Sequence, residues 1–207
     1  MAKPARRAAR RGQTHRRDGA AGDPAARLIA AALQLATTKG WARTSLADVA
    51  AEAGLPAGAA QAIFSSKTAL LIGFMRGIDA AVVAAGPASG GSSRDRLFEI
   101  LMRRYDALTP HKVAVKAIAR DLGQEPMAGL CVLAAVPKSM TAMLTAAGVP
   151  ADGLAGTFRA LGLGLVNAVA LRAWLEDETP DMAKTMAALD QALLQAQSFA
   201  QVLDLAR

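Results

Sequence analysis

The side chains best suited to binding a charged ligand lie at the start of this 207-residue chain. Residues 1–22 contain seven basic side chains and one acid, so they carry +6 of the formal charge of +7. Apolar residues are few there, so we expect residues 1–23 to form a disordered basic arm. Guanidinium groups bind phosphate, and such an arm can follow a DNA backbone or enter a minor groove. A solvated terminus and attraction to an anionic membrane surface are the alternatives. The arginines expected to contact DNA are Arg6, Arg7, Arg10, Arg11, Arg16 and Arg17.

Residues 44–71 have the pattern of two short helices joined by a tight turn and followed by the start of a third helix. Ser45 is placed to cap the first helix, and Asp48 lies three residues later, where it can complete a capping box. Gly54 can supply the left-handed residue that ends this helix, and Pro56 suits the first turn of the next. The pattern predicts a helix-turn-helix, whose second helix has a shape that fits a DNA major groove.

Together with the preceding helix, this segment resembles the N-terminal domain of TetR-family transcriptional regulators over about residues 25–75. The family pattern runs from an apolar first helix through a Gly-aromatic pair to the helix-turn-helix and a Phe-x-x-Lys ending. The resemblance implies an all-α TetR-like fold, with a three-helix DNA-binding domain at residues 24–75 and a helical ligand-binding and dimerisation domain at residues 76–207. The matching landmarks are Ile29, Ala32, Leu33, Gly40, Trp41, Thr44, Val49, Ala50, Ala53, Gly54, Gly58, Phe64, Lys67 and Leu70.

The second helix of the predicted helix-turn-helix departs from the family pattern. The family usually places Thr, a bulky apolar residue, Tyr and often His there, whereas this chain has Ala59, Ala60, Gln61 and Ile63. Direct readout needs donors or acceptors that reach base edges, and only Gln61 offers them. Either the domain binds DNA mainly through phosphates, or it has kept the fold and lost its operator. Besides the arginines, the positions expected to contact DNA are Thr44, Ser45, Ala57, Gly58, Gln61 and Lys67.

Catalytic and metal-binding patterns are missing from the sequence. His15 lies in the basic arm and His111 follows a proline, so no cluster has metal-ligand spacing. The glycines at 162 and 164 lie inside an apolar helical stretch, where they favour close helix packing over nucleotide binding. Ser139 has no plausible general base in the sequence. We therefore expect a non-enzymatic protein without a metal or cofactor.

The compartment is predicted from cysteine use and apolar runs. Cys131 is the one cysteine, so no disulfide framework exists, and its apolar neighbours predict a buried reduced thiol. No apolar h-region follows the basic start, and we expect no run long enough to cross a bilayer. A cytoplasmic protein follows from these observations.

The body after the head is predicted to be entirely helical. A Gly/Ser/Pro run at residues 86–93 marks the clearest break in the sequence. Beyond it, apolar residues recur at helical spacing and the prolines fall mainly at the gaps, which gives about nine helices for the whole chain. The predicted body helices are 94–108, 111–122, 126–147, 152–177 and 180–205.

The methionines and the many apolar residues of the body predict two functions for it, ligand binding and dimerisation. Flexible thioether side chains suit a pocket for variable apolar ligands, such as a fatty-acyl or isoprenoid chain. The expected lining is Met140, Met143, Phe158, Leu161, Leu165 and Trp174. The last two helices also carry more apolar surface than one protomer can cover, which predicts a two-fold homodimer. Its expected contacts are Leu154, Phe158, Leu161, Leu165, Met182, Met186, Leu189, Leu193 and Ala196.

The body also resembles the ubiquinone-biosynthesis accessory proteins, a lipid-binding family with a TetR-like fold. This second resemblance implies an isoprenoid-type or fatty-acyl ligand and a contact with a quinone-modifying enzyme or a membrane. It leaves two hypotheses: a ligand-controlled DNA-binding regulator, or a lipid-binding accessory protein that has kept the fold without operator recognition. The residues that carry it are Asp95, Leu97, Phe98, Arg103, Asp106, Leu108, Trp174, Asp177, Pro180, Thr185, Leu189 and Asp190.

Overall fold

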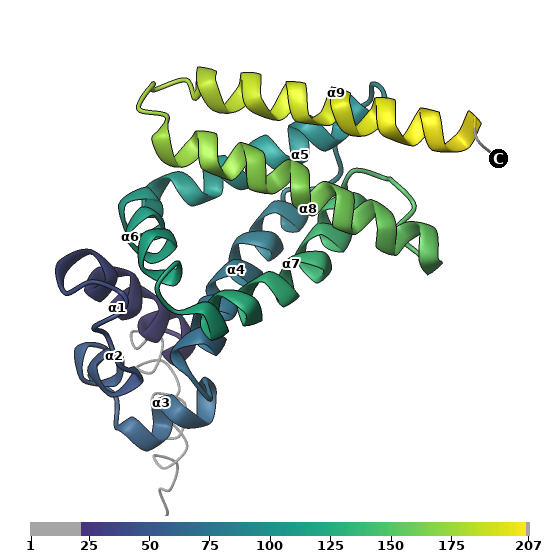
Figure 1. Cartoon of the computed structure of the whole chain (residues 1–207). Helices are drawn as coiled ribbons and strands as arrows, with labels where there is room; N and C mark the ends of the chain where they lie inside the picture. The colour runs from purple at the N-terminus through teal and green to yellow at the C-terminus, as the bar shows by residue number, and fades with distance from the viewer. Residues whose placement is uncertain (1–21, 206–207) are drawn as a thin grey trace, which may run out of the picture.

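The computed structural model describes the backbone of residues 22–205 and the side chains of residues 22–198 (Figure 1). Over this part of the chain it has nine α-helices, one short 3-10 turn at Thr109–His111, and no strand. The predicted all-α fold is therefore confirmed. The helices are α1 Pro24–Thr38, α2 Leu46–Glu52, α3 Ala57–Ile63, α4 Lys67–Ala84, α5 Ser93–Leu108, α6 Lys112–Leu122, α7 Pro126–Ala146, α8 Gly153–Glu176 and α9 Ala183–Leu205.

The predicted signals at the helix ends of the helix-turn-helix are confirmed. The Ser45 hydroxyl accepts a hydrogen bond from the Asp48 amide at 3.1 Å, and the Asp48 carboxylate accepts one from the Ser45 amide at 2.8 Å, which is a capping box. Gly54 has φ +64°, the left-handed conformation that ends α2. Ser66 then caps α4 by accepting from the Ala69 amide at 3.0 Å. These local contacts set where α2 begins and ends and where α4 begins.

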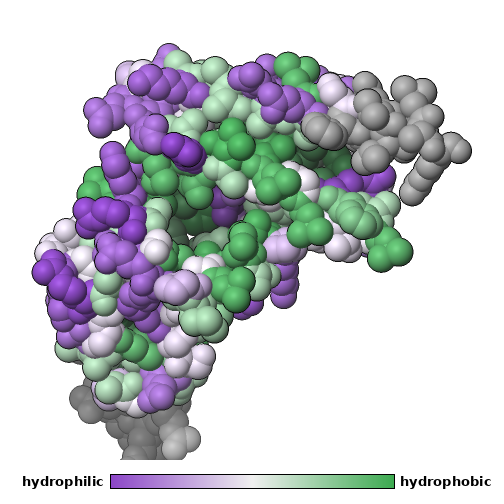
Figure 2. Space-filling model, viewed as in Figure 1, coloured by the Kyte–Doolittle hydropathy of each residue, from purple (hydrophilic) through white to green (hydrophobic). Residues whose placement is uncertain are grey.

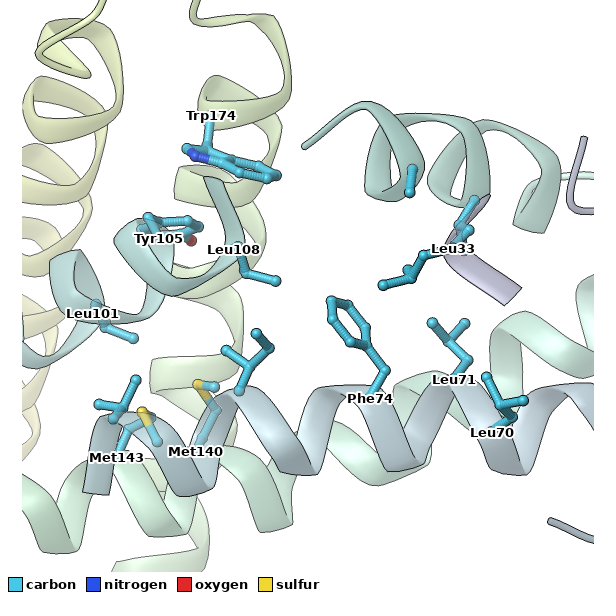
Figure 3. Close-up of a cluster of buried hydrophobic side chains, with 14 of the residues drawn as sticks. Leu33, Leu70, Leu71, Phe74, Leu101, Tyr105, Leu108, Met140, Met143 and Trp174 are labelled. Carbon is cyan, nitrogen blue, oxygen red and sulfur yellow. The ribbon is translucent and has the colours of Figure 1, made fainter. Parts of the chain in front are cut away.

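The long helix α4 connects the two parts of the molecule (Figure 1). Helices α1 to α3 gather at its first turns and form the head, while α5 and α7 pack along its remainder. Helix α8 packs on α7, and α9 packs on α8 and α5, which together with α6 complete the body. The predicted boundary between residues 75 and 76 falls inside this helix. One core runs the length of α4, from Leu33 and Leu71 in the head to Tyr105 and Met140 in the body (Figure 3).

A buried ion pair holds α4 against α5 in the body. The guanidinium of Arg104 on α5 donates to the carboxylate of Asp79 on α4 at 3.0 Å, and both residues are less than a tenth exposed. A charge in such a setting is tolerated only with its partner in place. The pair therefore fixes how α5 lies on α4.

The start of α9 differs slightly from the prediction. The helix begins at Ala183, because Asp177 and its neighbours form a capped turn after α8. The buried Asp177 carboxylate accepts from the Thr185 amide and hydroxyl, both at 2.8 Å, and from the Thr179 amide at 3.0 Å. Asp181 also accepts from the amide of Ala183, the first residue of α9, at 3.3 Å.

The expectation that no segment could cross a bilayer is wrong by length and composition. Helices α7 and α8 are both long enough, with a mean hydropathy of 1.5 in their most apolar stretches. Core helices of soluble proteins meet the same criterion, so this is weak evidence for a membrane protein. Only 22% and 33% of the residues in those stretches are buried. Much of the apolar surface of these two helices therefore lies uncovered in the single chain.

Candidate nucleic-acid interface

Helix α3 presents a nearly smooth surface to solvent. Ala60 is fully buried beneath it, whereas Ala57, Gly58 and Gln61 are exposed. This places three of the predicted DNA-contacting positions together on one accessible face. Because two of them lack any polar side-chain atom, Gln61 supplies the one side-chain amide on this face that can address a base edge.

The residues before α2 divide between exposed and buried positions. Ser45 is exposed, but its hydroxyl and amide are engaged with Asp48 in the capping box. Lys39 lies 2.8 Å from the same carboxylate, and its hydrogen bond, with those from Ser45, holds the pKa of Asp48 well below its usual range. Thr44 is only 3% exposed, and its hydroxyl donates to the Gly40 carbonyl at 2.8 Å. Thr44 was predicted to contact DNA, but its side chain is buried and its hydroxyl bonds within the loop between α1 and α2.

Lys67 also has an internal role that the sequence prediction missed. Its ammonium donates to the Trp41 carbonyl at 2.9 Å and to Glu125 Oε1 at 3.0 Å, and it lies 5.0 Å from the centre of the Trp41 ring. With these partners the side chain is directed toward the body and away from the face of α3. Lys67 joins head to body, so a direct phosphate contact requires breaking these bonds.

A second residue that sequence reasoning missed joins α6 to the head. Asp121 Oδ2 accepts from the Ala42 amide at 3.1 Å. This hydrogen bond, opposed by burial and supported by the neighbouring Arg120, keeps the pKa of Asp121 below its usual value. Asp121 thus binds the loop at residues 40–42 directly, and Glu125 binds it through Lys67, so the end of α6 and the turn after it are joined to this loop. The sequence offers no local signal for these pairings, because their members lie far apart in the chain.

The six predicted arm arginines, Arg6 to Arg17, lie outside the described residues. The part of the chain that the structure does describe contains no group of three or more His, Cys, Asp or Glu side chains arranged to hold a metal ion.

The predicted ligand-lining residues do not surround one cavity. Met140, Met143 and Trp174 are at most 1% exposed and pack in the core that Figure 3 shows. Phe158, Leu161 and Leu165 are 71%, 48% and 73% exposed on the outer face of α8. The physical reason is that α8 has two apolar faces: Leu163, Val166 and Trp174 lie on the buried one, so Phe158, Leu161 and Leu165 lie on the opposite face.

Two open clefts lie beside α6. One of about 680 Å³ lies between the end of α1, α6 and the end of α8, and is bordered by Thr38, Arg43, Lys116 and Arg120. The other, of about 560 Å³, lies between α6, the end of α8 and the turn that precedes α9. Trp174 borders this second cleft, and its buried indole nitrogen has no hydrogen-bond partner among the described residues.

The residues predicted for dimerisation differ in exposure between α8 and α9. On α8, Leu154, Phe158, Leu161 and Leu165 are all exposed. On α9, Leu189 and Leu193 are buried within the protomer, and only Ala196 of the predicted set is exposed. Met182 and Met186 are half-buried.

The predicted burial of Cys131 is wrong. The thiol is exposed, because Cys131 lies on the side of the first half of α7 that faces solvent. On that face Met127, Leu130 and Leu133 are 71%, 59% and 63% exposed.

Comparison with known proteins places these features in a family. Residues 28–73 match the model of the bacterial regulatory proteins of the tetR family. A TetR transcriptional regulator from Nitrosomonas europaea has a similar structure, with a TM-score of 0.65 and 19% identity, covering 84% of this chain and 99% of that one.

A TetR transcriptional regulator from a Rhodococcus species is also similar, with a TM-score of 0.57 and 26% identity, covering 84% of this chain and 94% of that one. No curated protein matches the chain. The landmarks from Ile29 to Leu70 all lie within the matched residues 28–73. Residues 28–73 are thus similar to the N-terminal domain of the tetR family of bacterial regulatory proteins, and the described helices have the TetR-like fold.

Proposed function

We propose that the protein is a transcriptional regulator that binds DNA as a homodimer and responds to a small hydrophobic ligand. The observation that carries this proposal is the exposed face of α3 on a capped helix-turn-helix within the tetR-family match. A helix in this position enters the major groove in helix-turn-helix proteins, and two heads related by a dyad read two half-sites. Acting on chromosomal DNA, such a regulator works in the cytoplasm.

Phosphate contacts dominate this DNA binding. The small side chains of Ala57 and Gly58 allow the backbone of α3 to approach DNA closely, but they carry no base-reading groups. Gln61 can supply limited base readout, and the six arginines of residues 6–17 account for most of the net positive charge. Affinity should therefore depend strongly on salt, while sequence preference stays modest.

Ligand control rests on the cleft beside Trp174. Lys112 and Leu175 border it together with the Trp174 ring, and the Lys112 ammonium lies 5.1 Å from the centre of that ring. Helix α6 forms one wall of this cleft and also holds the head through Asp121. A ligand that moves α6 therefore changes the position of the loop at residues 40–42.

Binding to genomic fragments at several salt concentrations tests the proposal. The purified protein is mixed with sheared genomic DNA of its source, and the retained fragments are sequenced. We expect enriched fragments that share two half-sites about one helical turn, or a multiple of it, apart. Retention of fragments without any enriched sequence, or no retention of DNA at low salt, contradicts the proposal that the protein is a transcriptional regulator.

A lipid-binding accessory protein is the second candidate. Three observations favour it. Helix α3 has one side chain, Gln61, that can read a base, and Thr44 and Lys67 are hydrogen-bonded within the protein. The outer face of α8 is apolar and exposed. A fatty-acyl or isoprenoid ligand should then copurify and be found by extraction and mass spectrometry. Added quinones or fatty acids should also raise the melting temperature, since a hundredfold excess over the dissociation constant adds about 2.7 kcal/mol.

A further inference from the structure

The first of the two clefts beside α6 takes its walls from both the head and the body. It has a volume of about 680 Å³ and lies between the end of α1, α6 and the end of α8. In Figure 1, α6 lies between α1 and the end of α8, and Figure 2 shows mainly hydrophilic surface on this side of the molecule. Arg43 borders the cleft from the head, while Lys116 and Arg120 border it from α6. Three cations that are far apart in the sequence therefore line one cleft.

The lining of this cleft has an excess of positive charge. Glu176 is its one carboxylate, and it lies 3.9 Å from the exposed Arg172, which is outside the cleft. Among the described residues, neither Arg43 nor Lys116 forms an ion pair. Lys116 and Arg120 are four residues apart on α6, a spacing at which like charges repel each other. An anion bound in the cleft relieves this repulsion.

The two guanidinium groups are oriented by the protein but keep their terminal nitrogens available. Arg43 Nε donates to the Lys39 carbonyl at 2.7 Å, and Arg120 Nε donates to Asp121 Oδ1 at 3.2 Å. The terminal nitrogens of both side chains make no hydrogen bond in the part of the chain that the structure describes. A guanidinium presents paired N–H groups that match the oxygens of a phosphate or carboxylate. Each side chain can therefore bind an oxyanion without losing the contact that it already makes.

The hydroxyl groups at the edge of the cleft are already used. Thr37 Oγ1 and Thr38 Oγ1 both donate to the Gln34 carbonyl, at 2.7 Å and 3.1 Å. The side-chain donors left for a ligand are those of the three cations. The cleft therefore favours an anion over a neutral polar molecule.

The rest of the lining is apolar, which favours an organic anion over a bare ion. Val113 is 72% exposed on α6, and Leu175 is half-buried at the end of α8. Clefts of about 300–1,000 Å³ hold organic ligands, whereas a bare ion would leave this apolar surface in water. Three cations against one carboxylate also suit a dianion, and a phosphate monoester carries a charge of about −2 near neutral pH.

We propose that this cleft binds a small organic phosphate, with the phosphate between Arg43 and Arg120 and the apolar part against Val113 and Leu175. Arg43 belongs to the loop before α2 and Arg120 belongs to α6, so the bound phosphate braces the head against the body. The site is separate from the cleft beside Trp174 and goes beyond the proposed function.

Titration with phenyl phosphate tests the chemical class of the ligand. Calorimetry at low ionic strength compares phenyl phosphate, inorganic phosphate and benzoate on the full chain. Phenyl phosphate should bind about tenfold more tightly than inorganic phosphate, because its ring covers apolar surface of the cleft. It should also bind about tenfold more tightly than benzoate, because the second negative charge is matched by a further cation. Equal affinity for phenyl phosphate and either of the other two anions overturns the assignment to an organic phosphate.

Substitutions in the cleft test where the phosphate binds. Arg43→Gln and Arg120→Gln, made separately, should each weaken the binding of phenyl phosphate about tenfold or more, through the loss of a charge-assisted hydrogen bond. Arg76→Gln, at an exposed arginine on α4 outside the cleft, is the matched control and should leave the affinity unchanged. The basic residues 1–22 are present in every variant, so phosphate binding by them is the same throughout. Circular dichroism and melting temperature check that the variants remain folded. If both cleft variants bind as Arg76→Gln does, the site is wrong.

Hydrogen exchange tests the brace between head and body. At ten times the dissociation constant of phenyl phosphate, exchange through openings that release the ligand should slow about tenfold. We expect this protection in the loop at residues 39–43, and unchanged exchange at residues 153–165 of α8. Protection at residues 177–182 without protection of the loop places the ligand in the cleft beside Trp174 and overturns the proposal.

The remaining outcomes separate this site from the proposed function. Absence of phenyl phosphate binding overturns the site and leaves the regulator to its own test, the enrichment of genomic fragments. If Arg43→Gln lowers the salt slope of DNA binding but binds phenyl phosphate as the parent does, Arg43 contacts DNA and the phosphate site is wrong. Lys112→Met changes a residue that lines the cleft beside Trp174 and not this one. Weaker phenyl phosphate binding in Lys112→Met, with Arg43→Gln unchanged, likewise rejects the proposal.

Discussion

Lys67, the first residue of α4, holds Glu125 at 3.0 Å across the junction between the head and the body. The same ammonium donates to the Trp41 carbonyl at 2.9 Å, so one side chain joins the loop before α2 to the residue before α7. Asp121 makes a parallel connection to Ala42. A displacement of the turn between α6 and α7 should therefore also displace the loop that leads into the helix-turn-helix.

Replacing Lys67 should show whether it positions the head or contacts DNA. Lys67→Met should lower the free energy of unfolding by about 1 kcal/mol through lost hydrogen bonds and weaken DNA binding. The slope of log affinity against log salt should stay unchanged, because no phosphate contact is lost. Glu125→Gln, which keeps an acceptor, should have the smaller effect. A slope that falls by about 0.9 would instead identify a phosphate contact.

The basic arm should carry most of the salt dependence. Deleting residues 1–17 removes six arginines, and each phosphate neutralised contributes about 0.9 to the slope in B-DNA. The truncated protein should therefore bind more weakly at low salt and respond less to added salt. Fluorescence anisotropy over a salt series measures both quantities. An unchanged slope would mean that the arm makes no phosphate contacts.

Gln61 should account for whatever base preference α3 has. Gln61→Ala should cost about 1–3 kcal/mol on the preferred fragment and almost nothing on unrelated DNA. Gln195→Ala, at an exposed glutamine on α9, is the control for removing an amide far from the head. Equal losses on both DNA sequences would place Gln61 among the phosphate contacts.

Asp177 should make the stability of the body depend on acid pH. Burial raises the pKa of this carboxyl, but the hydrogen bonds from Thr179 and Thr185 outweigh burial and hold the pKa well below 3.8. The stabilisation is thus fully present above the ordinary pKa and is lost as the pH falls toward the folded-state value. Asp177→Asn should cost about 2 kcal/mol at neutral pH, and its difference from the parent should narrow in acid. Urea unfolding at several pH values measures this, with Asp152→Asn as the control, at an exposed carboxylate that makes no side-chain cap hydrogen bond.

The buried pair of Arg104 and Asp79 should be more sensitive to loss of one member than of both. Arg104→Met leaves Asp79 buried without a counter-ion and should cost about 3–5 kcal/mol. The double change Asp79→Leu with Arg104→Met removes both charges and should recover much of that loss. Denaturant unfolding of the parent, the single variants Arg104→Met and Asp79→Leu, and the double variant forms the cycle. Additive losses would show that the two side chains are not energetically coupled.

The local sequence was sufficient to predict the helix-turn-helix. Ser45 with Asp48, Gly54 and Ser66 determine where α2 and α4 begin and where α2 ends through contacts within four residues, so their outcome does not depend on distant parts of the chain. The helical spacing of apolar residues likewise predicted the body, because burial of one helix face is the main force that places such segments.

Only the tertiary structure decided which side chains point inward. Lys67 and Thr44 match the family pattern in sequence, yet one bonds to Trp41 and Glu125 and the other to Gly40. Periodicity identifies an apolar face but cannot tell a face that packs within the protomer from one that awaits a partner. Cys131 was therefore predicted to be buried and Phe158 to line a cavity, whereas both side chains are exposed. The hydrophobic effect favours burial of apolar area, but the packing of helices that are distant in sequence decides which side chains are buried.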